Sequence, residues 1–99
     1  MRTLVRAMLE VEASNKSIKD GSLPNTMKMV MEKFKPEAAY FLAMDGCRTC
    51  IMVIDMKDPS EIPQIAEPFF STMNAKVDFF PAMNADDLQK GLQAWMAGQ

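Results

Sequence analysis

Residues 38–56 read AAYFLAMDGCRTCIMVIDM, and this stretch decides the fold. Residues 38–44 are a nearly continuous apolar run, which is typical of a buried strand. Asp45-Gly46 follows, and this dipeptide is the strongest short signal for a hairpin turn. Residues 47–56, with an apolar centre at 51–54, predict the returning strand. The middle of the chain is therefore predicted to be an antiparallel β-hairpin.

On the N-terminal side of the hairpin, the sequence predicts one strand and one helix. Residues 3–11 alternate with a period of two, which indicates a strand. Residues 12–21 are polar and predict a connection, with room for one helical turn closed by Gly21. An apolar stripe at helical spacing then predicts a helix over 23–35, which Pro36 ends.

On the C-terminal side, the sequence predicts a helix, a strand and a last helix. Asp58-Pro59 begins the first of these helices, Pro68 should kink or divide it, and Asn74 should end it. Residues 75–82 predict the fourth strand. Asn84 is expected to cap the last helix. The buried side of that helix is predicted to consist of Leu88, Leu92, Trp95 and Met96.

The predicted order is β-α-β-β-α-β followed by a terminal helix, within one domain spanning residues 1–99. Two βα units around a central hairpin are the split-βαβ, ferredoxin-like arrangement. It belongs to the α+β class, with helices on one face of a four-stranded antiparallel sheet. A chain of 99 residues has room for one such domain.

Composition narrows the functional classes. Eleven basic and thirteen acidic side chains leave a net charge of −2, so no nucleic-acid partner is expected. There is no histidine, which removes histidine acid/base catalysis, histidine metal ligands and a histidine-ligated haem. No apolar run approaches the length that spans a bilayer, and the N-terminus is too charged for a signal peptide. We expect no membrane partner and a cytoplasmic location.

Both faces of the central hairpin are apolar, although a sheet with helices on one face usually has a polar second face. So large an apolar patch usually marks an interaction surface. The predicted cover is a second copy of the chain, packed sheet to sheet about a two-fold axis, which makes a dimeric α+β barrel. The alternative is that the last helix wraps across the open face of a monomer. The opposed hairpin residues are Tyr40, Leu42 and Met44 against Ala39, Phe41 and Ala43.

Several motifs also carry a resemblance: KPEAAYF at 35–41, Asp45-Gly46 followed by Arg48-Thr49, IPQIAEPFF at 62–70, and Asn74-Ala75 through Pro81 to Met83-Asn84. Over most of its length the chain resembles a group of small uncharacterised bacterial proteins of the dimeric α+β barrel (ferredoxin-like) superfamily. The resemblance implies the fold and the homodimer. It carries over no catalytic residue, because the close group has no assigned activity. The wider superfamily includes monooxygenases, isomerases and ligand-binding stress proteins, so the fold alone does not give a function.

The sulfur-containing residues are predicted to be structural. Cys47 and Cys50 have CxxC spacing, but residues three apart in a strand point to opposite faces, so the pair suits neither a disulfide nor one metal ion. Met27 and Met31 lie one helical turn apart, which would suit copper(I), but they share an apolar stripe and are better explained as core. No metal and no cofactor is expected.

Five polar side chains are the candidate site residues. Arg6 and Glu10 lie on one face of the first predicted strand, and Asp78 lies on the fourth, which neighbours the first in this topology. If that face is the open one, these charges enter the barrel interior and could orient a small polar ligand. Glu10 or Asp78 would then serve as a general base and Arg6 as an anion clamp, with Tyr40 or Arg48 contributing from the hairpin. The alternative is that they form structural ion pairs at the rim, or edge charges that discourage aggregation.

The sequence therefore predicts a protein that binds a small molecule, or a minor enzyme, with its pocket between sheet and helices or inside the barrel. The alternative is a non-catalytic interaction module whose barrel interior is packed. Cofactor-independent monooxygenase-like or isomerase-like chemistry is suggested only by analogy with the superfamily.

Overall fold

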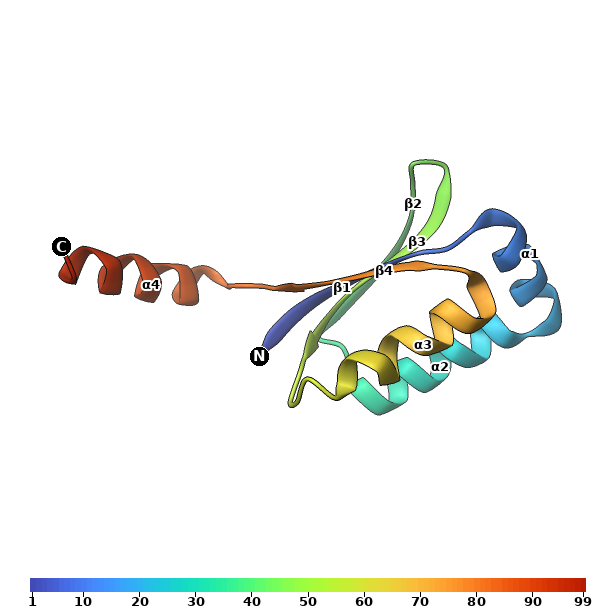
Figure 1. Cartoon of the computed structure of the whole chain (residues 1–99), viewed down its shortest axis with the longest axis horizontal. Helices are drawn as coiled ribbons and strands as arrows, with labels where there is room; N and C mark the ends of the chain where they lie inside the picture. The colour runs from blue at the N-terminus through green and yellow to red at the C-terminus, as the bar shows by residue number, and fades with distance from the viewer.

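The computed structural model describes residues 1–99 and contains four strands and four helices (Figure 1). The strands form one antiparallel sheet in the order β2-β3-β1-β4. This is the predicted ferredoxin-like α+β arrangement with a C-terminal helix. The elements are β1 (Arg2–Met8), α1 (Val11–Asp20), α2 (Ser22–Phe34), β2 (Ala38–Met44), β3 (Cys47–Asp55), α3 (Glu61–Met73), β4 (Lys76–Pro81) and α4 (Ala85–Ala97).

The central hairpin forms as its sequence predicts. Met44 pairs with Cys47, so the turn between β2 and β3 contains only Asp45 and Gly46. Both turn residues have positive φ angles, 52° and 77°. A two-residue turn of this kind matches the right-handed twist of the strands, and glycine and aspartate tolerate the left-handed conformation that it needs.

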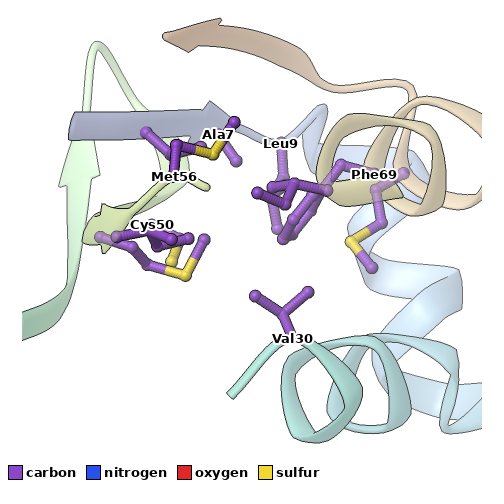
Figure 2. Close-up of a cluster of buried hydrophobic side chains, with 11 residues drawn as sticks. Ala7, Leu9, Val30, Cys50, Met56 and Phe69 are labelled. Carbon is purple, nitrogen blue, oxygen red and sulfur yellow. The ribbon is translucent and has the colours of Figure 1, made fainter. Parts of the chain in front are cut away.

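The hydrophobic core lies between the sheet and the layer formed by α1, α2 and α3 (Figure 1). Figure 2 shows Val30 of α2 and Phe69 of α3 pointing into the same space as Ala7 and Cys50 of the sheet. Val5, on the central strand β1, is fully buried in this core. The cluster consists of Val5, Ala7, Leu9, Val30, Cys50, Met52, Ile54, Met56, Ile65, Phe69 and Met73.

The prediction for the segment after β1 was wrong. The first strand ends at Met8 rather than at residue 11, and α1 is a ten-residue helix rather than a connection with one turn. The side chains that α1 buries are small hydroxyls, Ser14 and Ser17, and so the sequence shows no apolar stripe there. Each hydroxyl has a partner, since Ser17 Oγ donates to the carbonyl oxygen of Thr72 at 2.9 Å and Ser14 Oγ to that of Val11 at 3.1 Å. Buried hydroxyls are tolerated when they are hydrogen-bonded in this way.

Two details of α3 also differ from the prediction. The helix begins at Glu61 rather than at Pro59 with Asp58 as its cap, because Asp58 forms a turn in which its carboxylate accepts a hydrogen bond from the backbone N–H of Ser60. Of the two outcomes predicted for Pro68, a kink or a division, the division does not occur, since the helix runs from residue 61 to residue 73. Asn74 ends it in the left-handed conformation, as predicted, with φ 46°.

The last helix forms where predicted but is not buried. Asn84 caps it in a capping box with Asp87. However, α4 contains no buried residue and extends away from the other helices and the sheet (Figure 1). It does not cover the face of the sheet that α1, α2 and α3 leave exposed. The stripe predicted to be buried is 48% to 67% exposed, and consists of Leu88, Leu92, Trp95 and Met96.

None of the four helices is both long enough and apolar enough to span a lipid bilayer.

The neighbours Phe69 and Phe70 provide a matched test of this core. Phe69 is fully buried and Phe70 is 45% exposed. Phe69→Ala is expected to lower the free energy of unfolding by about 3–5 kcal/mol, because it leaves a cavity in the core. Phe70→Ala removes the same atoms and is expected to cost less than half as much. Urea denaturation followed by circular dichroism measures both, and equal losses would contradict this placement of the core.

Candidate functional site

The face of the sheet that the helices leave uncovered is apolar, as the sequence predicts. Side chains alternate along a strand, so Val5 and Ala7 point into the core while Leu4, Arg6 and Met8 point to the other side. Cross-strand pairing aligns further residues with these three. We call this surface the open sheet face; its apolar members include Leu4, Met8, Ala38, Tyr40, Leu42, Met44, Ile51, Val53 and Phe80.

One ion pair lies within the open sheet face. Arg6 of β1 and Asp78 of β4 are cross-strand partners, and Arg6 Nη2 lies 2.8 Å from Asp78 Oδ2. The Arg6 guanidinium also lies over the ring of Phe80, 5.5 Å from its centre. The two charged side chains are 36% and 45% exposed, and a pair this accessible to water contributes about 0–1 kcal/mol to stability. The small stabilisation that the ion pair contributes therefore does not explain its presence on an apolar face.

The Arg6 side chain has one polar atom without a partner. Its Nε is buried and donates a hydrogen bond to no acceptor. Leaving a buried donor unsatisfied costs about 1–3 kcal/mol, and such groups in proteins usually have a partner. A ligand oxygen that reached this N–H would supply the missing acceptor.

Tyr40 shares the open sheet face with Arg6. Arg6 pairs with Ile51 of β3, and Ile51 pairs with Tyr40 of β2. The two polar side chains therefore flank Ile51 two strand spacings apart, which is about 10 Å along the sheet. Tyr40 is 68% exposed in the single chain. A molecule a little larger than one aromatic ring can contact both side chains.

Glu10 and Arg48, the other two candidates, lie elsewhere. Glu10 follows the end of β1, and its carboxylate accepts a hydrogen bond from the side-chain amide of Asn74. Arg48 points to the helix-covered side of β3, where its Nη1 donates to Ser14 Oγ at 2.7 Å and to the carbonyl oxygen of Val11 at 3.4 Å. Arg48 connects the sheet to α1, whereas Glu10 connects the start of α1 to the end of α3. Contrary to the prediction, Glu10 and Arg48 therefore do not share a sheet face with Arg6. Asp78 and Tyr40 do share that face.

A second charged cluster, which sequence reasoning missed, lies at the start of β1. Arg2 Nε lies 2.8 Å from Glu37 Oε1, and Arg2 Nη1 lies 3.2 Å from Asp87 Oδ2. The hydrogen bond to Glu37 raises the pKa of Arg2 above its ordinary value. Nearby, hydrogen bonding to Lys57 lowers the pKa of Asp55 to about 2. These partners are far apart in sequence, so no local pattern indicates them.

Three cavities are not lined by Arg6, Tyr40 or Asp78, although Leu42 of the open sheet face lines the third of them. A cleft of about 490 Å³ lies where Thr3, Ile62 and Phe79 meet. A more polar hollow of about 790 Å³ includes Arg2 and Asp87. A third, strongly apolar groove of about 200 Å³ lies at the edge of β2. There is thus a pocket between the sheet and the helices, but Arg6, Tyr40 and Asp78 do not line it.

The two cysteines are free and differ in exposure. Cys50 is buried in the core, and burial raises the pKa of its thiol to about 11 because the thiolate would lose its hydration. Cys47 is partly exposed at the other side of the sheet. Histidine, cysteine, aspartate and glutamate side chains do not gather in groups of three that could hold a metal ion.

No protein-family model matches the chain, and no curated protein matches it in sequence. The fold itself is compatible with many activities.

The difference between the two thiols predicts a labelling pattern. At pH 8 the Cys50 thiol stays protonated, because burial raises its pKa to about 11, and the thiolate is the form that reacts. We expect a chromogenic disulfide reagent to label Cys47 faster than Cys50 in the native chain, and Cys50 only after denaturation. Cys47→Ser is the control and should leave no rapidly labelled thiol. Rapid labelling of both thiols in the native chain would contradict the burial of Cys50.

Proposed function

We propose that the protein is a homodimer whose two open sheet faces enclose a binding site for a small organic molecule. The observation that carries the proposal is the unpaired, buried Arg6 Nε on a mostly apolar face. The molecule would carry at least one acceptor oxygen, as a carboxylate or a carbonyl does, beside an apolar or aromatic body.

The dimer is supported by the apolar character of the open sheet face. Tyr40, Leu42 and Phe80 are 68%, 38% and 44% exposed. A continuous apolar surface of this kind is unfavourable in water, and a second copy of the same surface is the simplest cover for it. Packed sheets lie about 10 Å apart, and interdigitating side chains fill the space between them. A ligand would therefore lie where the side chains of the two faces leave a gap beside Arg6.

The chemistry of the site follows from the donors on Arg6. Asp78 occupies Nη2 and fixes the orientation of the guanidinium, which leaves Nε and Nη1 as donors for a ligand. Hydrogen bonds from a charged donor are stronger than neutral ones, and the surrounding apolar side chains exclude competing water. The Tyr40 hydroxyl provides a second polar contact and the Phe80 ring an apolar one. This arrangement binds and orients a molecule.

We also propose a cytoplasmic location. The two free thiols are consistent with a reducing compartment, where disulfides are rare.

Arg6→Met tests the site directly. It keeps the length of the side chain and removes its donors. We expect the native protein to gain thermal stability with at least one member of a panel of aromatic carboxylates and ketones, of which benzoate is the simplest. The affinity of Arg6→Met for that compound should fall about tenfold or more, because a hydrogen bond to a charged group contributes about 1.5–3 kcal/mol.

Arg48→Met is the control for that experiment. It makes the same chemical change on the helix-covered side of β3, and it should leave the affinity almost unchanged. Equal binding by Arg6→Met and the native protein would refute the site. A panel without any binder would favour the alternative, an interaction module with a packed interior.

Leu42→Glu tests the interface. It places a charge on the open sheet face, where burial against a second copy would remove it from water. Sedimentation equilibrium should show that it weakens the dimer by more than about tenfold. Ala43→Glu, at the next residue on the opposite side of β2, should remain dimeric. If the two variants have the same mass as each other, the open sheet face is not the interface.

A further inference from the structure

The last helix makes the chain too extended for a compact domain of its length. The radius of gyration is 15.9 Å and the longest dimension is 56 Å. A compact domain of about 100 residues has a radius of gyration of about 13 Å. The excess comes from α4, which extends beyond the end of β4 (Figure 1).

The start of α4 is held in this outward position. Asp87, in its first turn, pairs with Arg2 of β1, and the Ala82 backbone N–H donates to the carbonyl oxygen of Arg2 at 3.0 Å. Arg2 is itself held by Glu37. The capping box joins Asp87 to Asn84, so the same carboxylate begins the helix and ties it to the sheet. These contacts oppose a rotation that would fold α4 back onto its own chain.

An isolated helix of this length is not stable by itself. Helices shorter than about 12–15 residues are marginal in water, and α4 has 13 residues. Gly91 in its middle costs a further ~1 kcal/mol relative to alanine. In proteins, the stability of such a helix comes from packing its apolar face. The apolar stripe of α4 is therefore without a partner on its own chain.

We propose that α4 is an arm that docks on a second copy of this chain, with its stripe of Leu88, Leu92, Trp95 and Met96 packed against the partner. Two-fold symmetry makes the exchange reciprocal. The inference rests on the proposed dimer and adds to it a second contact, outside the space between the sheets.

The area of the stripe fits a second copy. The four side chains are 48% to 67% exposed in the single chain. Reciprocal docking would cover two such stripes and the surfaces against them, which adds to the area buried between the sheets, and stable dimers bury large areas. A membrane surface fits less well, because the charged residues of α4 are Asp86, Asp87 and Lys90, and interfacial helices carry a face rich in lysine and arginine.

The chain also contains an apolar groove that suits the docking of α4. The groove of about 200 Å³ at the edge of β2 is lined mostly by apolar side chains, and Ile18 and Phe41 in it are 46% and 62% exposed. β4, which leads into α4, and β2 are the two edge strands of the sheet. When two sheets pack with crossed strands, β4 of one copy can run across the other copy toward its β2 edge.

The single tryptophan of the chain, Trp95, reports on the arm directly. At concentrations where light scattering gives a dimer, we expect blue-shifted emission and roughly threefold weaker acrylamide quenching than for a solvent-exposed indole, because the partner shields the ring. Dilution to monomer should remove the protection. Leu92→Glu should expose Trp95 and weaken the dimer, whereas Gln93→Glu, with the same new group on the polar side of α4, should behave like the native protein.

Mass and fluorescence separate the failure of this inference from the failure of the proposed function. A dimer in which Trp95 is fully quenched would overturn the arm and leave the sheet interface intact. Protection of Trp95 in the monomeric Leu42→Glu variant would show that α4 folds onto its own chain, which also overturns the arm. Protection that arises only with vesicles of phosphatidylcholine and phosphatidylglycerol would overturn it in favour of a membrane surface. A monomer at every concentration would contradict both proposals.

Discussion

The alternation of side chains along β1 is the constraint on which the rest of the molecule depends. β1 is a central strand, paired with β3 on one side and β4 on the other. Burial of Val5 and Ala7 under the helices sends Arg6 to the opposite side. A shift of one residue in this register would exchange the two faces, burying the guanidinium in the core. The hydrophobic core and the polar group of the candidate site are therefore fixed by the same backbone pairing.

The same register explains why the charge on this face is useful. Arg6 lies opposite Asp78 and beside Phe80, so its charge is balanced while one of its donors has no partner. Such a group is costly in a face that a second copy covers, unless something supplies an acceptor. An apolar surface is stabilised when a second surface buries it, and a polar group within the buried region then needs a hydrogen-bond partner.

The sequence predicts an element of this structure well where the pattern that indicates it lies within that element. The hairpin follows from Asp45-Gly46 between apolar runs, and period-two alternation brings Arg6 and Asp78 to one face. The helix α1 escaped prediction because the side chains that it buries are serines, whose hydrogen bonds form only in the folded chain. The pattern in α4 identifies its apolar side correctly but not what covers it, since periodicity describes one helix and burial requires two surfaces. Arg48 was placed with Arg6 because a hairpin sequence does not state which face the helices cover.

The most direct test of the central claim, that two open sheet faces meet, is a nuclear Overhauser experiment on an equal mixture of isotope-labelled and unlabelled chains, filtered for contacts between copies. We expect contacts from the side chains of Leu42 and Ile51 of one copy to open-face side chains of the other. Contacts between copies that involve only other surfaces, or no contacts at all at millimolar concentration, would show that the open sheet face is not the interface and that Arg6 is not enclosed by a dimer.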